Sequence, residues 1–105
     1  MAVIYHANDN LIEVTAVDKS GDADSAVTTG TVEVTLLDAA GAEVAGETWP
    51  LALSYNATRQ KWRATLLNSL SGIELGAGLV ALVEVTTSGG RYGSEREPVR
   101  VIRRQ

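Results

Sequence analysis

Hydrophobic and polar residues alternate with a period of two through most of this chain. In the segment TVEVTLLDAAG, which starts at residue 31, Val32, Val34 and Leu36 alternate with polar residues before a turn of small residues. This period places the three aliphatic side chains on one face of a strand, and the polar residues Glu33 and Thr35 on the other. The pattern predicts a strand with one face toward a core and one toward water.

The same alternation predicts further strands, at residues 2–6, 11–17, 48–55, 61–67, 79–87, and 91–92 with 98–104. Pro50 has no N–H for a strand ladder, so we expect its strand to lie at a sheet edge or to carry a bulge. Residues 61–67 are expected to pair with that strand as a hairpin. Residues 79–87 are the longest apolar run and predict a central strand, followed by a tight turn at residues 88–90.

Three stretches interrupt the alternation. Residues 18–30 are rich in Gly, Ser, Asp and Thr, which predicts a long surface connection. Residues 68–78 predict an irregular crossing segment over one end of the core. The charged GSERE stretch, residues 93–97, interrupts the last strand, so we expect a bulge there.

The chain has no helical pattern, and six to eight short strands separated by turns predict an all-β fold. The favoured architecture is an immunoglobulin-like Greek-key β-sandwich of about seven strands, and a small barrel is the alternative. Trp49 and Trp62 are the expected large core residues. A length of 105 residues indicates one domain, residues 11–105, preceded by an arm or first strand at residues 1–10.

The composition excludes several kinds of chemistry and points to no particular reaction. The chain has no cysteine, which excludes disulfides and thiolate ligands, and its formal net charge is −4. Its first residues show no secretion signal, so we expect the protein to stay in the cytoplasm where it is made. The C-terminal end is basic, and could bind an acidic protein surface or nucleic acid; a charged edge strand that resists aggregation explains it equally well.

No constellation of residues predicts an enzyme, a metal site or a cofactor site. His6 is the only histidine, so neither a zinc site nor a serine triad can be assembled. Asp18, Asp22 and Asp24 could offer oxygen ligands to calcium, but they lack the spacing of a calcium loop and fit a solvated acidic loop better. Glu33 and Glu84 fit acids on the outer face of a sheet better than a glycosidase pair.

The strand and turn segments carry a resemblance to known families. LIEVTAV, TVEVTLLDAAGAEVAGETWPLALSY, KWRATL and LVALVEVTT together resemble immunoglobulin-like domains of the macroglobulin or bacterial Ig type. The segments VIYHANDNLIEVT and AGAEVAGETWPLALSY look like small proteins encoded among the head and neck genes of tailed bacteriophages. This resemblance implies a virion structural protein without catalytic residues, an accessory factor that decorates the capsid or lies at the head-to-tail junction.

The resemblance also implies how such a protein would act. Its partners would be phage coat or neck proteins, it would form a homo-oligomer on the particle, and neither membrane nor nucleic acid is expected. A carbohydrate-binding or host-surface-binding module is the alternative, although only Tyr5 and Tyr92 are left as exposed aromatic candidates. The expected contact residues are Val3, Tyr5, His6, Asp22, Asp24, Arg91, Tyr92, Arg96, Arg100, Arg103 and Arg104.

Overall fold

The computed structural model describes residues 3–5, 10–18, 25–66, 76 and 78–102, and these residues form strands and connections without any helix. The all-β prediction is therefore confirmed. The strands are β1 (Val3–Tyr5), β2 (Asn10–Val14), β3 (Val17–Asp18), β4 (Ser25–Ala26), β5 (Thr31–Leu37), β6 (Leu51–Asn56), β7 (Lys61–Leu66), β8 (Gly78–Thr86) and β9 (Tyr92–Ile102).

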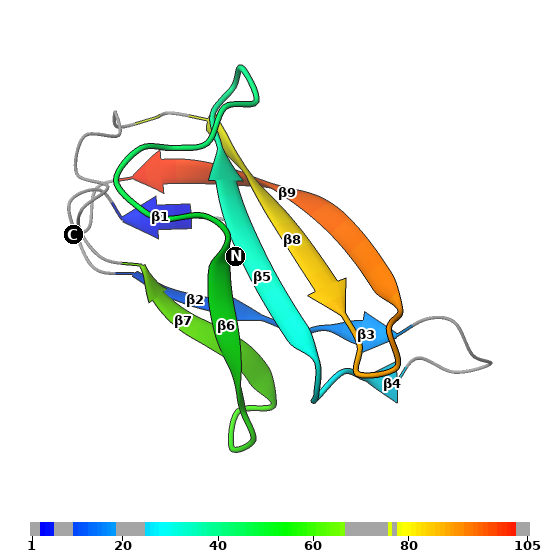
Figure 1. Cartoon of the computed structure of the whole chain (residues 1–105). Coiled ribbons are helices and arrows are strands. Elements are labelled where there is room, and N and C mark those ends of the chain that lie inside the picture. Colours follow the sequence, from blue (N-terminus) through cyan, green and yellow to red (C-terminus); the bar gives the residue numbers. More distant parts are fainter. Residues whose placement is uncertain (1–2, 6–9, 19–24, 67–75, 77, 103–105) are drawn as a thin grey trace.

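Most of the strands belong to one curled sheet (Figure 1), with the order β1-β9-β8-β5-β6-β7-β2. Six of these strands, β9 through β2, pair antiparallel, and β1 adds to β9 in the parallel direction. The short strands β3 and β4 pair only with each other. The hairpins β6–β7 and β8–β9 and the central place of β8 are as the sequence predicts.

The strand β6 produces the curl, because its two halves pair with different neighbours. Its first half, Leu51 to Leu53, pairs with β5, whereas Ser54 to Asn56 pair with β7. The sheet therefore bends within β6, and β7 and β2 turn toward the inner face of β5, β8 and β9. The core lies inside this curl.

The buried core confirms the period-two pattern. On β5, Val32, Val34 and Leu36 are at most 1% exposed, as expected of the aliphatic face. Opposite strands supply similar residues, among them Ile12 of β2 and Leu66 of β7, both fully buried. Other core residues are Ala16, Val27, Val44, Leu53, Trp62, Leu79, Ala81, Val99 and Val101.

The polar face of β5 is less exposed than the alternation predicts. Thr35 and Leu37 are also buried, because the chain after β5 folds back over the end of this strand. Leu37 forms a bridge with Glu43, and the N–H of Val44 donates to the carbonyl of Leu36. Both faces of the second half of β5 are thus covered.

The prediction that Pro50 marks an edge strand or a bulge is wrong. The peptide bond between Trp49 and Pro50 is cis, and β6 begins only after it, at Leu51. Pro50 therefore removes no ladder hydrogen bond, and β6 lies in the interior of the sheet between β5 and β7. Trp49 is half-buried against the core, and Trp62 is fully within it.

The predicted bulge in the last strand is also wrong. From Tyr92 to Arg100, every residue of β9 pairs in unbroken register with β8, and the charged residues of GSERE are part of this ladder. Main-chain pairing does not require apolar side chains, so the charged stretch interrupts the hydrophobic pattern without interrupting the strand.

The connection predicted at residues 18–30 contains structure at both ends. Asp18 pairs with Ser25, and Val27 is buried with its N–H donating to the carbonyl of Ala16. The expectation of a surface connection is therefore wrong for Val27, whereas Ala26 is exposed. Residues 19–24, and the crossing segment predicted at 68–78 except for Gly76 and Gly78, lie outside the described residues.

Candidate functional site: a groove beside the open edge of β9

The first half of β9 forms an edge of the sheet. β1 pairs only with Arg100 to Ile102, and no described strand pairs with the outer side of Tyr92 to Val99. At the opposite end of the sheet order, the outer side of β2 is likewise without a described neighbour. Because the sheet curls, these two open edges face each other across the molecule.

The hairpin geometry determines which main-chain groups of β9 point outward. The N–H of Thr87 donates to the carbonyl of Arg91, so this pair is of the hydrogen-bonded type. Hydrogen-bonded and non-hydrogen-bonded pairs alternate along an antiparallel ladder, so the odd-numbered residues of β9 bond to β8. Ser94 and Arg96 therefore direct their N–H and C=O groups toward the open edge, as does Pro98 with its carbonyl alone.

A groove of about 820 Å³ lies between the two edges. Its base is apolar, with Val14 of β2 and Val83 and Val85 of β8 packed against the core but not fully buried. One wall is the segment from Gly93 to Pro98, and the other comes from β2, β3 and β7. The residues lining the groove on that second side are Glu13, Thr15, Val17 and Lys61.

Two carboxylates of β9 share the groove-facing side of the strand. Val99 and Val101 are buried in the core, and the period of two places Glu97 and Glu95 on the same face as these valines. Arg96 lies on the opposite face. The edge thus presents two acids inward, of which Glu95 is exposed and Glu97 half-buried, and one exposed cation, Arg96, outward.

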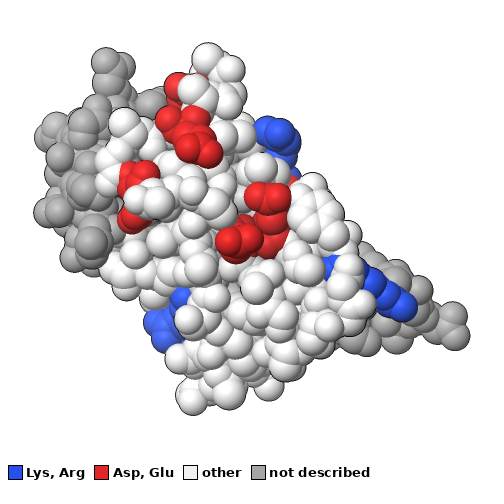
Figure 2. Space-filling model, in the orientation of Figure 1, with Lys and Arg blue, Asp and Glu red and all other residues white. Residues whose placement is uncertain are grey.

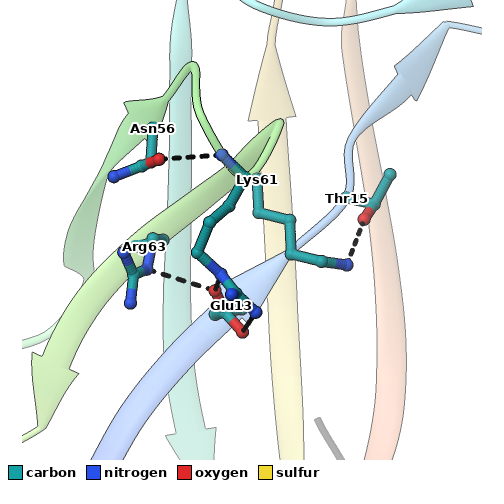
Figure 3. Close-up of polar contacts among 6 residues, drawn as sticks. Glu13, Thr15, Asn56, Lys61 and Arg63 are labelled. Atoms are coloured by element: carbon teal, nitrogen blue, oxygen red, sulfur yellow. Dashed lines mark hydrogen bonds and ion pairs between the residues drawn. The ribbon is translucent and has the colours of Figure 1, made fainter.

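The wall of the groove that β2, β3 and β7 form carries a cluster of charges around Glu13, which is drawn in Figure 3. The guanidinium of Arg59 donates to both carboxylate oxygens of Glu13, from Nε to Oε2 at 2.7 Å and from Nη2 to Oε1 at 3.3 Å. Arg63, the cross-strand neighbour of Glu13, brings its Nε to 3.1 Å from Oε2 in an ion pair. The hydrogen bond from Arg59, and secondarily the positive charges of Arg59, Arg63 and Lys61, hold the pKa of Glu13 below its ordinary value.

The β6–β7 turn positions this cluster. Asn56 accepts a hydrogen bond at its Oδ1 from the N–H of Arg59, and Gln60 adopts a left-handed φ of 56°, which closes the turn and starts β7. Lys61 at the start of β7 then extends to β2, where its Nζ donates to Thr15 Oγ1 at 3.1 Å. Contacts between residues far apart in the sequence therefore fix this wall of the groove.

A second polar contact lies at the start of β9, on the other face of the sheet. Tyr92 is 63% exposed, and its hydroxyl donates a 2.6 Å hydrogen bond to Glu84 of β8. This bond raises the pKa of Tyr92 above its ordinary value. Glu84 is also the direct cross-strand partner of Glu33, so two carboxylates are neighbours on this face.

The surface seen in Figure 2 is predominantly acidic at its centre, with basic side chains at its margins. This distribution agrees with the net charge of −4. No group of three or more potential metal ligands occurs among the described residues. The described part of the chain also has no helix with the length and hydrophobicity that a membrane crossing needs.

The structure places the sequence-predicted contact residues unevenly. Val3 and Tyr5 belong to β1, which is a paired edge strand rather than a free arm. Arg91, Tyr92, Arg96 and Arg100 are exposed on β9 and the turn before it. The predicted contacts that lie outside the described residues are His6, Asp22, Asp24, Arg103 and Arg104.

Sequence reasoning missed the residues that form the groove. The charged stretch predicts only a bulge at Glu95 and Glu97, although the alternation traced backward from Val99 and Val101 places both acids on one face. Glu13 and Lys61 read as ordinary exposed positions of two strands. Their grouping depends on the register between β2 and β7, for which the sequence carries no direct signal.

The groove combines an open main-chain edge, an apolar base and charges of both signs, which are features that can bind another chain. Comparison with known proteins adds no family to this description. No family model, curated protein or solved structure matches the chain.

Proposed function

We propose that this chain is a structural protein of a tailed-bacteriophage virion. It would be a small accessory factor, made in the host cytoplasm, that decorates the capsid or lies at the head-to-tail junction and binds coat or neck proteins. The proposal starts from the resemblance of VIYHANDNLIEVT and AGAEVAGETWPLALSY to proteins of phage head and neck genes. It adds a homo-oligomeric arrangement on the particle, where repetition gives avidity to individually weak contacts.

The observation that carries this proposal is the open edge of β9 beside the groove. An edge with unpaired main-chain groups can accept a strand from another protein, and neighbouring side-chain positions then give selectivity. Among the described residues, no group of three or more potential metal ligands occurs. These features favour an assembly module over an enzyme.

The finer architecture belongs to the same proposal. An immunoglobulin-like sandwich would have two sheets enclosing one core, and the curl within β6 brings β2 and β7 opposite β5, β8 and β9 in a comparable way. We take the fold as a sandwich of this kind in which β6 contributes to both layers.

A carbohydrate-binding or host-surface-binding module is the second candidate, and the exposed ring of Tyr92 is the observation in its favour. Sugar-binding sites commonly combine exposed aromatic rings with free polar groups. Here the indole N–H of Trp49 donates to the carbonyl of Val44, that of Trp62 donates to the carbonyl of Val27, and the hydroxyl of Tyr92 donates to Glu84. Binding on a glycan array that the variant Tyr92→Ala abolishes would favour this candidate.

Fractionation of phage particles tests the virion proposal. Tailed particles from the source strain are separated on a density gradient, and the chain is detected with an antibody raised against the purified protein. We expect the chain to sediment with particles in a fixed ratio to the coat protein after a wash in high salt. A chain found only in the soluble fractions of a lysate rich in particles would overturn the proposal.

A truncated chain tests where the contact lies. Removing residues 1–8 deletes β1, which pairs only with Arg100 to Ile102 at the sheet edge, so we expect the fold to persist and particle attachment to be lost. The variant Glu43→Gln, in an exposed connection away from both edges, is the control. Undiminished co-sedimentation of the truncated chain would exclude the N-terminal strand from the contact.

A further inference from the structure

We infer that two copies of this chain form a two-fold dimer in which the open edges of β9 pair antiparallel, with Ser94 opposite Ser94 of the other copy. This dimer rests on the proposed function, since it gives the proposed homo-oligomer its contact surface. It would form in the purified chain without any particle, so the dimer and the virion role can fail separately.

The main chain of β9 offers a short pairing edge. Tyr92, Ser94 and Arg96 each direct an N–H and a C=O outward, whereas Pro98 offers a carbonyl alone. β1 occupies the same edge from Arg100 onward, so an added strand has to end before that residue. A copy centred on Ser94 meets this limit, because its Tyr92 lies opposite Arg96 and its β8–β9 turn lies opposite Pro98.

Main-chain hydrogen bonding favours this register over its neighbour toward the turn. Residues with outward N–H and C=O groups have to face one another in an antiparallel pair. Centred on Ser94, the dimer pairs Ser94 with Ser94 and, twice, Arg96 with Tyr92, for about six hydrogen bonds. Centred on Gly93, it retains only the two pairs of Ser94 with Tyr92, for about four.

Charge disfavours the registers shifted the other way. A register centred on Glu95 or on Arg96 places that residue against its own copy, and like charges directly opposite destabilise paired strands. The inferred register instead places Glu95 opposite Gly93 and Glu97 opposite Arg91, and so opposes no like charges. This selection requires only that like charges do not face each other, and not that any of these side chains lacks a partner within its own chain.

The groove side of the edge has room for the opposing side chain. Gly93 has no side chain, and a Cβ added to it would meet no atom within 4 Å, so the space beside it is open. The exposed Glu95 of the other copy would enter this space. Val85, which pairs with Gly93 on β8, is only partly buried and lines the groove. The methylene groups of that glutamate would therefore cover apolar surface in each copy.

The outer side of the edge brings together a cation and an aromatic ring. Arg96 of each copy lies opposite Tyr92 of the other, and both residues are exposed in the single chain. Tyr92 is 63% exposed, and the hydrogen bond from its hydroxyl to Glu84 holds the ring in place. A guanidinium close to the face of such a ring is attracted to it. The dimer would thus cover this ring in both copies.

Two-fold pairing through β9 closes the assembly. Each copy uses the same edge once, so no third copy can add there. An open strand edge is otherwise a template for uncontrolled pairing. The outer side of β1 stays available in this arrangement, so the β9 edge would serve the dimer and the N-terminal strand the proposed contact with the particle.

Single cysteines can read the register, because the chain has none of its own. In the variant S94C the two cysteines form a hydrogen-bonded pair with Cα atoms about 5.5 Å apart, which a disulfide can bridge. E95C and R96C are the controls on the same strand. In the inferred register their copies lie about 8 Å or more apart, beyond the reach of a disulfide.

Mild oxidation of each purified variant, followed by a non-reducing gel, measures the cross-link. We expect S94C to give at least about 10-fold more covalent dimer than E95C or R96C, because only its cysteines lie within bridging distance. Preferred cross-linking of E95C or R96C would show another register. Failure of all three variants to cross-link would exclude the β9 dimer.

Charges placed on the two-fold axis supply a reversible test. S94E and S94K each put like charges opposite one another, so both should sediment as monomers at low salt under conditions where the wild type is a dimer. An equimolar mixture of the two variants should recover the dimer. Ser94 is exposed, so both variants should keep the dispersed amide spectrum of a folded chain.

The matched controls are T58E and T58K, which make the same changes of net charge in the exposed β6–β7 turn. Both should remain dimeric. A wild type that sediments as a monomer at every concentration, or S94E and S94K variants that stay dimeric, would overturn the inference. Dissociation of the T58E and T58K variants as well would show a general effect of charge and exclude this axis.

Two variants of Arg96 separate the main chain from the side chain. R96A removes the side chain and keeps the outward N–H, whereas R96P removes both, and proline is tolerated on a strand edge whose N–H the sheet does not use. We expect R96P to weaken the dimer at least about 5-fold more than R96A, because it also loses a main-chain hydrogen bond in each copy. Equal effects of the two variants would show that the edges do not pair through their main chains.

The dimer and particle experiments give distinguishable outcomes. A chain that forms the S94C cross-link but never sediments with particles would retain the dimer and lose the virion role. A chain that is monomeric in solution, and sediments with particles equally well as wild type and as S94K, would retain the virion role and lose the dimer.

Discussion

The indole N–H of Trp62 on β7 donates a 2.7 Å hydrogen bond to the main-chain carbonyl of Val27. Trp62 is 5% exposed, and its ring meets that of Tyr55 edge to face at 5.6 Å. Val27 directly follows β4, and its own N–H donates to Ala16. The Trp62 side chain of the large sheet thus attaches the segment at Val27, and with it the small sheet of β3 and β4, to the core.

Replacement of this tryptophan should be costly. We expect Trp62→Phe to lower the free energy of unfolding by about 2–4 kcal/mol, because it leaves a buried carbonyl unpaired and a cavity beside the smaller ring. Urea denaturation followed by circular dichroism measures the change. Trp49→Phe is the matched control, since Trp49 is only half-buried, and it should cost about 1 kcal/mol. Equal losses would contradict the anchoring role of Trp62.

Gly30 is predicted to tolerate no side chain. Its φ is +97°, and an added Cβ would lie 2.2 Å from the carbonyl oxygen of Thr86. We expect Gly30→Ala to destabilise the fold by about 3 kcal/mol or more, from backbone strain and this steric overlap. Gly41→Ala supplies the comparison, because Gly41 also has a positive φ but open surroundings, and should cost about 1–2 kcal/mol. Thermal unfolding of the two variants would reveal the difference.

Glu13 should make stability depend on acid pH. Its pKa is lowered in the folded state by the hydrogen bond from Arg59, so its contribution is present above the unfolded pKa, about 4.3, and is lost as the pH falls through the folded value. The stability difference between the wild type and Glu13→Gln should therefore be positive at pH 7 and shrink below about pH 4. Denaturant midpoints across this range measure it. In an Arg59→Met background the difference should be smaller; an equal difference would show that Arg59 is not the partner.

Tyr92 should titrate at a higher pH than an ordinary tyrosine. The hydrogen bond to Glu84 favours the neutral phenol, so the folded pKa is raised. The associated stability is present below the unfolded pKa of about 10 and is lost as the pH rises through the folded value. Subtracting the absorbance titration at about 295 nm of Tyr92→Phe from that of the wild type isolates this group. Glu84→Ala should lower the midpoint, and an unchanged midpoint would assign the shift to another cause.

Those parts of the fold that depend on local alternation could be predicted from the sequence. Val32, Val34 and Leu36 are buried as the period of two requires, and Leu79 and Ala81 follow the same rule on β8. The hairpin turns were also predictable, because small and polar turn residues separate the strands that pair.

The candidate site was not predictable, because it depends on contacts over long sequence distances. Arg59 reaches Glu13 only through the register of β2 against β7, and the groove exists only because β6 bends between two partners. The pairing of Glu95 with β8 was not predictable for another reason. Hydrogen bonds between main chains leave no trace in side-chain polarity, so a charged edge segment looks irregular.

The parallel pairing of β1 with β9 has a consequence for synthesis on the ribosome. Arg100, the partner of Val3, is added to the chain 97 residues after Val3. At roughly 5–20 residues per second, β1 waits about 5–20 s before its place in the sheet exists. Closure of this edge therefore has to wait until β9 has been made, and a chain that stops short of β9 would leave both β1 and the edge of β8 without their partners.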